Sequence, residues 1–232
     1  MLSKIPVQAA PLRSRVAERI RTAITSGQLQ AGEHLREREL CEQLGVSRTS
    51  IRESLRILES EGLITSIPNK GVAVTGITLK ESQDVYETRG ALEGLLVRLF
   101  VRNATDQQIT KLNEVVDAIE KYNRHFKVER FVKLKLRFYE LIMEGADNQI
   151  AANALRAIHA RVAQLWATSL TNPERANRSV IEIRTLVLAI KARDEVAAAK
   201  ACADHIASAS RNVSQVLTER DSNLAAKERL TA

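Results

Sequence analysis

The sequence predicts a mainly α-helical protein, with a small mixed unit at its amino end followed by an antiparallel bundle of helices. Residues 36–75 read as two short amphipathic helices joined by a tight turn and followed by a β-hairpin. After Gly76 no proline occurs until Pro173, and apolar residues recur at helical spacing to about Leu217. The 232 residues are enough for two separate cores.

The first helix of the pair is expected to end at Gly45. Leu40, Cys41 and Leu44 form its apolar stripe, and glycine tolerates the positive φ that ends a helix. Ser47 then suits the N-cap of the second helix, because its side-chain oxygen can accept a free backbone N–H.

The second helix, which runs to about residue 61, has an inward apolar face and an outward polar face near its amino end. The outward residues are Arg48, Thr49, Ser50, Arg52 and Arg56. Arginine can donate two hydrogen bonds to guanine, and Ser or Thr can bond bases or phosphates, so this face suits a major groove. The alternative is a solvated face, which the adjoining turn, helix and hairpin disfavour.

The hairpin is expected from two β-prone runs, 63–67 and 72–75, with Pro68, Asn69, Lys70 and Gly71 as the turn between them. A lysine at its tip can reach a phosphate or the minor groove, and glycine lets the backbone come close. This hairpin is therefore a second candidate for contact with double-stranded DNA.

Composition favours a polyanionic partner without locating it. The net charge is +7, but residues 1–78 hold 11 Lys and Arg against 8 Asp and Glu, and residues 79–232 hold 24 against 20. The positions of the arginines are thus a stronger argument for DNA binding than the net charge. Aromatic residues make up 3%, too few for the stacking surface of a single-strand binder.

Two cysteines far apart in sequence, Cys41 and Cys202, are expected to be reduced and buried. No stretch approaches the roughly 18 apolar residues that span a bilayer, and the amino end lacks the apolar core of a signal peptide. We expect a soluble cytoplasmic protein with no membrane partner.

The bundle is expected to contain six helices joined by short polar turns. Their approximate bounds are 79–102, 105–124, 128–145, 149–170, 173–193 and 194–217. The predicted organisation is a unit of residues 1–78, a bundle of residues 79–220 and a frayed polar tail of residues 221–232. No phosphate-binding glycine loop, HExxH or GxSxG motif occurs, so we expect no enzyme activity and no catalytic residues.

The runs IRTAITSGQLQAGEHL, RERELCEQLGVSRTSIRESLRILESEGLI and NKGVAV resemble the winged helix-turn-helix of the GntR family of bacterial transcription regulators, over about residues 10–76. The resemblance implies a regulator that binds an inverted-repeat operator as a homodimer. Carried over position by position, it implies DNA contacts by Arg38, Ser47, Arg48, Thr49, Ser50, Arg52, Lys70 and Gly71.

The bundle resembles the FCD ligand-sensing domain of the FadR subfamily, through YETRGALEGLLVRLFV, RFYELIMEGADNQ and LVLAIKARDEVAAAKACADHI. Members commonly hold a metal through Asp and His on one helix plus two further His. Here the corresponding residues are Lys135, Tyr139, Ile183 and His205. One histidine cannot hold a divalent ion beside an ammonium, so we expect no metal and no other cofactor.

The residues in place of the metal ligands suggest a carboxylate site. Lys135 and Tyr139 lie one helical turn apart. Arg89, in the R-x-x-L-E motif that matches the FCD pattern, can donate two hydrogen bonds to the same carboxylate, beside His205. The resemblance thus implies an effector, expected to be a small organic acid that releases the regulator from DNA. Two alternatives stay open. In one, Lys135 reaches solvent and the plugged bundle is purely structural; in the other, the chain is a helical enzyme with a DNA-binding appendage.

Overall fold

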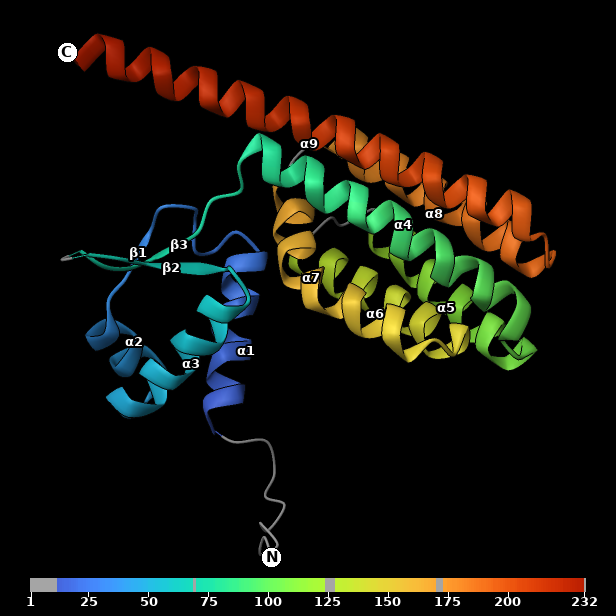
Figure 1. Cartoon of the computed structure of the whole chain (residues 1–232), viewed down its shortest axis with the longest axis horizontal. Coiled ribbons are helices and arrows are strands. Elements are labelled where there is room, and N and C mark those ends of the chain that lie inside the picture. The colour runs from blue at the N-terminus through green and yellow to red at the C-terminus, as the bar shows by residue number, and fades with distance from the viewer. Residues whose placement is uncertain (1–11, 69, 124–127, 170–172, 232) are drawn as a thin grey trace, which may run out of the picture. The chain divides into compact units, whose positions relative to one another are not determined.

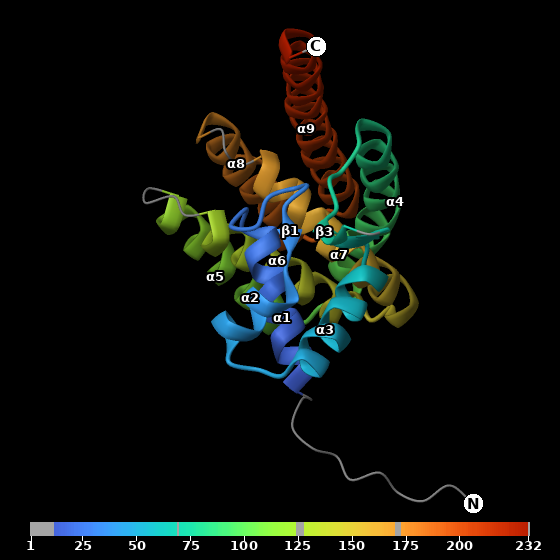
Figure 2. The same cartoon turned by 90° about the vertical axis from the view of Figure 1, so that its left-hand side faces the viewer.

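The computed structural model describes residues 12–68, 70–123, 128–169 and 173–231. The chain divides into two compact units, Met1–Gly76 and Ile77–Ala232, which we call the N-terminal unit and the helical unit. Figures 1 and 2 show the elements of each. The division falls just before the expected boundary at residue 78, because the Ile77 side chain is buried in the core of the helical unit.

The N-terminal unit packs helices and a small sheet around one apolar core. Its elements are α1 (Leu12–Thr25), β1 (His34–Leu35), α2 (Glu37–Leu44), α3 (Arg48–Ser60), β2 (Ile64–Ile67) and β3 (Gly71–Val74). Apolar side chains at helical spacing on α1 and α3 meet in this core; they include Val16, Ile20, Ile24, Ile51, Leu55 and Leu58. Burial of these faces fixes which side of α3 remains exposed.

The sheet has the strand order β1-β3-β2, and both pairings are antiparallel. Strands β2 and β3 confirm the predicted hairpin, with Ile64 opposite Val74 and Ile67 opposite Gly71. Strand β1 was not expected, because two residues are too short to show an alternating pattern. It pairs with β3 through Leu35 opposite Val72, and so joins the segment before α2 to the hairpin.

The helical unit consists of α4 (Leu79–Asn103), α5 (Asp106–Asn123), α6 (Val128–Ala146), α7 (Gln149–Ser169), α8 (Pro173–Lys191) and α9 (Glu195–Thr231). The six predicted helices are confirmed, with ends that differ by a few residues. The expected end near Leu217 is wrong, however, since α9 continues to Thr231. Residues 221–231 are rich in Ala, Leu, Lys, Glu and Arg and contain neither Gly nor Pro, so helix propensity favours this continuation.

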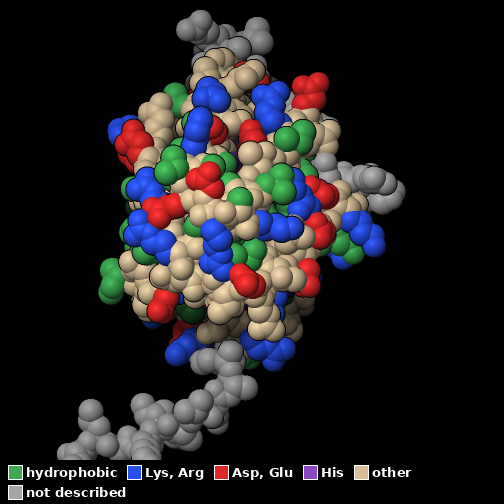
Figure 3. All heavy atoms as spheres, turned by 90° about the vertical axis from the view of Figure 1, so that its right-hand side faces the viewer, with side chains coloured by type: hydrophobic (Ala, Val, Ile, Leu, Met, Phe, Trp, Pro, Cys, Tyr) green, Lys and Arg blue, Asp and Glu red, His purple; other side chains and the backbone are tan. Residues whose placement is uncertain are grey.

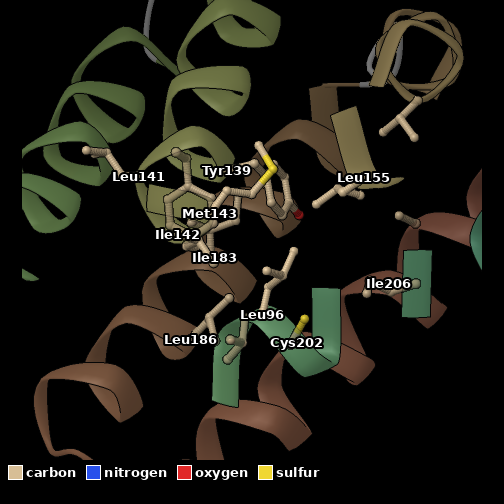
Figure 4. Close-up of a cluster of buried hydrophobic side chains, with 14 of the residues drawn as sticks. Leu96, Tyr139, Leu141, Ile142, Met143, Leu155, Ile183, Leu186, Cys202 and Ile206 are labelled. Atoms are coloured by element: carbon tan, nitrogen blue, oxygen red, sulfur yellow. The ribbon is translucent and has the colours of Figure 1, made fainter. Parts of the chain in front are cut away.

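Helix α9 packs along α4 and α8 in the helical unit (Figure 1), α4 also contacts α6 and α7, and α5 contacts α6 and α8. Apolar side chains from α4, α6, α7, α8 and α9 meet in one core (Figure 4), where Tyr139 lies among Leu96, Met143 and Leu155. No helix in the described part of the chain is long and apolar enough to cross a membrane.

Gly145 lets α6 approach α4 closely. A Cβ at this position would lie 2.5 Å from Phe100 Cε2 and 3.2 Å from Ala104 Cβ. On the face of the molecule shown in Figure 3, basic and acidic side chains are interspersed. On the surface of the helical unit, the ion pair Arg102–Glu195 (2.6 Å) links α4 to α9, and Arg193–Asp106 (2.8 Å) links the turn between α8 and α9 to α5.

Candidate functional site

The turn between α2 and α3 is built by local sequence, as predicted. Gly45 ends α2 with φ 64° in the left-handed region, and its N–H donates to the Cys41 carbonyl at 2.9 Å. Ser47 caps α3 by accepting the Ser50 N–H at 3.2 Å. Both predictions are confirmed, and together they fix the angle at which α3 leaves the turn.

The exposed face of α3 begins at its first residue. Arg48, Thr49, Arg52 and Arg56 are exposed, whereas Ile51 on the opposite face is fully buried. The three arginines follow at intervals of four residues and therefore share one side of the helix. Ser50 is half-buried and Ser47 is exposed, and their hydroxyl oxygens lie 3.0 Å apart. The two serines therefore interact with each other at the N-cap of α3.

An acid on α2 holds one of these arginines. Arg52 Nε donates to both carboxylate oxygens of Glu37, at 2.9 and 3.0 Å, and this pairing raises the pKa of Arg52. The contact orients the guanidinium while its remaining N–H groups stay available to an acceptor. Arg38 on the same helix lies 3.6 Å from Glu42 and is exposed. Sequence reasoning missed Glu37, because no local spacing relates it to Arg52.

The hairpin places Lys70 and Gly71 near the start of α2. Both residues are exposed, and Gly71 has φ 84°, which favours glycine there. A groove of about 470 Å³ runs between this tip and the α2 amino end, and Arg36, Glu37, Lys70 and Gly71 are among its lining residues. Arg36 is thus a further exposed cation beside the predicted set.

The four predicted effector residues lie together inside the helical unit. Arg89, Lys135, Tyr139 and His205 are each no more than 2% exposed. Arg89 Nη2 donates to the Tyr139 hydroxyl at 3.3 Å, and Lys135 Nζ lies 3.4 Å from His205 Nε2. The alternative in which Lys135 reaches solvent does not hold, because packing on every side encloses its ammonium end.

Two carboxylates and an aromatic ring complete this buried polar cluster. Arg89 Nε donates to Glu93 at 2.6 Å. His205 Nδ1 lies 2.7 Å from Glu182 Oε2, and the same oxygen accepts two hydrogen bonds from Arg175, at 2.9 and 3.0 Å. The centroid of the Trp166 ring lies 5.4 Å from Arg89 Cζ and 4.6 Å from Lys135 Nζ. Glu93 could have been found from its spacing of four residues after Arg89. Trp166 and Arg175 carry no such signal.

Burial sets the protonation states in the cluster. It lowers the pKa of Lys135 well below its usual range, and the charges of Arg89 and Arg175 lower it further. Burial and the neighbouring Lys135 also lower the pKa of His205 to about 4.

Glu182 and Arg89 keep their charges. Burial opposes ionisation of Glu182, but hydrogen bonds from His205, Ser208 and Arg175 outweigh it and lower its pKa to about 2. Burial likewise opposes the charge on Arg89, and Glu93 outweighs it, so its pKa is raised. A neutral His205 then donates from Nδ1 to Glu182 and accepts at Nε2 from Lys135.

The residues at the positions where the FCD resemblance implies metal ligands do not fit a divalent ion. They provide a lysine amine, a phenol, the fully buried apolar side chain of Ile183 and a single imidazole. Among the residues that the structure describes, no group of three or more His, Cys, Asp or Glu is arranged to hold a metal.

A helix-turn-helix with an exposed arginine face and a β-hairpin beside it defines a DNA-binding protein, here joined to a helical unit with a buried polar centre. The family model described as bacterial regulatory proteins, gntR family, matches residues 12–74, and the FCD domain model matches residues 84–208. The chain belongs to the GntR family of DNA-binding transcription regulators and carries an FCD domain.

Relatives span most of the chain. An HTH-type transcriptional regulator, YdhC of Bacillus subtilis (strain 168), is 26% identical over 205 residues, 88% of this chain and 92% of its own length. The gluconate operon transcriptional repressor of Bacillus licheniformis is 30% identical over 134 residues, which cover 58% of this chain and 55% of that protein.

Solved structures share the fold. McbR/YncC of E. coli has a TM-score of 0.79 and 21% identity, covering 91% of this chain and all of the other. A transcriptional regulator described as GntR from Rhodococcus sp. RHA1 has a TM-score of 0.77 and 19% identity, covering 87% of this chain and 96% of that one.

Proposed function

We propose that the protein is a homodimeric repressor that binds an inverted-repeat operator and leaves it when a small organic acid binds the helical unit. The exposed arginines of α3 and the Lys70 tip support the DNA-binding half of this proposal. The DNA-binding surface of one chain contacts few base pairs. Two chains related by a two-fold axis present two such surfaces, which match the two halves of an inverted repeat. Repression follows the name of the gluconate operon relative, whereas the Glc operon relative of Escherichia coli (strain K12) is named an activator.

One observation carries the effector half. The Nη1 atom of Arg89 is buried and has no hydrogen-bond partner within the described part of the chain, and neither has the nearby Tyr86 hydroxyl. The two are neighbours, since Arg89 Cζ lies 5.1 Å from the Tyr86 ring centroid. Leaving a buried donor without an acceptor costs roughly 1–3 kcal/mol. A ligand carboxylate would satisfy both groups, which supports Arg89 as the effector's main anchor.

The charges of the cluster also favour an added anion. The guanidinium groups of Arg89 and Arg175 are balanced by the carboxylates of Glu93 and Glu182, which leaves Lys135 as the extra basic group. A carboxylate that enters beside Lys135 favours its protonated form, because an opposite charge stabilises an ammonium. Lys135, Tyr139 and His205 would then bind the carboxylate together with Arg89.

Control of DNA binding follows from a difference in affinity. An effector shifts the dimer toward the form that releases DNA only if it binds that form more tightly than the DNA-competent one. The buried cluster joins α4, α6, α8 and α9, so a ligand there alters the packing of helices rather than a surface loop. In this proposal the protein acts in the cytoplasm, catalyses no reaction and needs no metal.

A thermal-shift screen against small mono-, di- and tricarboxylates tests the sensor. An acid that binds only the folded state raises the melting temperature, by an amount that grows with its concentration. The same acid should release a labelled operator in a gel-shift assay. Lys135→Ala should abolish both effects while leaving operator affinity without effector near that of the wild type.

Lys133→Ala is the matched control, because Lys133 is exposed two residues earlier on the same helix. It should respond like the wild type. If Lys135→Ala still released DNA at the wild-type effector concentration, the sensing site would lie elsewhere. If no acid shifted the melting temperature, the helical unit would be structural, as in the alternative reading of the sequence.

The dimer and the absence of metal have their own tests. Sedimentation equilibrium should give twice the chain mass of 25.8 kDa. Elemental analysis of purified protein should find no stoichiometric Zn, Ni or Mn, and chelators should leave the melting temperature unchanged. A full equivalent of tightly bound metal would contradict the proposed effector chemistry and favour a metal-assisted site.

A further inference from the structure

A second polar cavity lies at the surface of the helical unit, between α8 and α9. Its volume is about 360 Å³, and its lining includes Arg175, Arg178, Ser208, Arg211, Asn212 and Gln215. Helix α8 begins at Pro173, so the free backbone N–H groups of its first turn lie at this end. The lining belongs to two packed helices, so the cavity is part of the bundle rather than of a loop.

The charge of this cavity is unbalanced. Three arginines line it against one carboxylate, that of Glu174, among the described residues. Arg178 and Arg211 are exposed, and neither forms a hydrogen bond or ion pair with any residue that the structure describes. Like charges held close together repel, and an anion between them relieves that repulsion. The two free guanidinium groups can also bind oxygen atoms of one anion in pairs.

Arg175 forms the inner wall of the cavity. Its side chain is only 4% exposed, and two of its nitrogens donate to Glu182 Oε2 at 2.9 and 3.0 Å. A guanidinium has five N–H groups, so it retains donors for a second acceptor. Asn212 adds a buried Oδ1 atom that has no partner within the described residues. A ligand that carries both an anionic group and a hydroxyl donor would satisfy this atom as well.

We propose that the cavity between α8 and α9 is a binding site for a small dianion with several acceptor oxygens, such as a phosphate group or a dicarboxylate. Arg178 and Arg211 are its principal ligands, and Arg175 contacts the anion from the inner wall. The site lies at the surface of the helical unit, whereas the proposed carboxylate site around Arg89 is buried, and the two share the Arg175–Glu182 ion pair. Because Arg175 also holds Glu182, which bonds His205, an anion here acts on the buried cluster through a direct chain of contacts.

Calorimetric titration of the full chain tests this site. Inorganic phosphate and succinate are titrated separately at constant ionic strength, with chloride and acetate as monoanion controls. Saturable binding of at least one dianion, with one site per chain and no binding of either monoanion, is expected. Comparison of the phosphate and succinate arms decides which chemistry the site prefers.

Variants locate the bound anion. Arg178→Ala/Arg211→Ala should weaken binding at least about tenfold, which corresponds to about 1.4 kcal/mol. Arg175→Ala is avoided, because it would leave the Glu182 carboxylate without its cation. Lys111→Ala/Lys191→Ala removes the same charge from exposed positions that have no described partner, and it should bind like the wild type.

The DNA-binding face could also attract phosphate, so Arg48→Ala is included and should leave the anion affinity unchanged. The proposal is overturned if neither dianion binds saturably, or if the Arg178/Arg211 variant, shown to be folded by circular dichroism, binds like the wild type. It is also overturned if the lysine control or Arg48→Ala loses binding to the same extent. In those last two cases, the heat of titration would come from nonspecific attraction of the anion to positive charge or from its binding at the DNA-binding surface.

Discussion

Replacing Lys135 with methionine should change how the stability of the helical unit depends on pH. In the folded protein, burial and the charges of Arg89 and Arg175 lower the pKa of Lys135 well below that of an unfolded lysine. The Trp166 ring, 4.6 Å from Nζ, favours the ammonium and opposes this shift without overcoming it. Between the folded and unfolded pKa values, the unfolded chain therefore binds one more proton than the folded chain.

The sign and slope follow from linkage. Since the unfolded state binds the extra proton, the free energy of unfolding rises with pH in this window, by at most about 1.4 kcal/mol per pH unit for one proton. For 150–250 residues, 1 kcal/mol corresponds to about 2–4 °C. Between the folded and unfolded pKa values of Lys135, the wild-type melting temperature should thus rise relative to Lys135→Met, by at most several degrees per pH unit. Below the folded pKa both states are protonated, and the slope disappears.

Differential scanning fluorimetry over this pH range measures the difference between wild type and variant, so that contributions from groups that do not interact with Lys135 cancel. Lys133→Met, at an exposed position on the same helix, should follow the wild-type slope. Equal slopes for wild type and Lys135→Met would refute the reasoning, because they would mean that the Lys135 ammonium is retained on folding.

Three further predictions concern the DNA interface and the core. Arg48→Ala should reduce the free energy of operator binding by roughly 1–3 kcal/mol and relax base preference, as measured by gel shift. Unchanged affinity would show that α3 is not the helix that contacts the bases. Lys70→Ala should weaken binding to all sequences and reduce the steepness of the salt dependence, whereas a loss confined to the operator would contradict a phosphate contact. Gly145→Ala gains up to about 1 kcal/mol of helix propensity but forces a Cβ to 2.5 Å from Phe100 Cε2, an overpacking cost of about 1–3 kcal/mol. A lower melting temperature is expected, and a higher one would show that α4 and α6 adjust freely.

Much of the DNA-binding unit could be read from the sequence, because the signals that build it are local. Gly45 ends a helix through its own backbone freedom, and Ser47 caps the next helix through an atom three residues from its donor. The apolar spacing of Ile51, Leu55 and Leu58 determined which face of α3 stays exposed. Strand β1 was missed because pairing with β3, rather than any pattern of its own, makes it a strand.

The sequence by itself determined the helices, the residue types at Lys135, Tyr139, Ile183 and His205, and the arginines of α3. Only the tertiary structure decided which polar groups meet. It brings Glu37 to Arg52, Glu182 to His205 and Arg175, and the arginines of α8 to that of α9. Propensity and capping act within a few residues, so a single sequence reveals them. Burial and pairing act between helices far apart in the chain, and they set the protonation state of Lys135 only after those helices have packed.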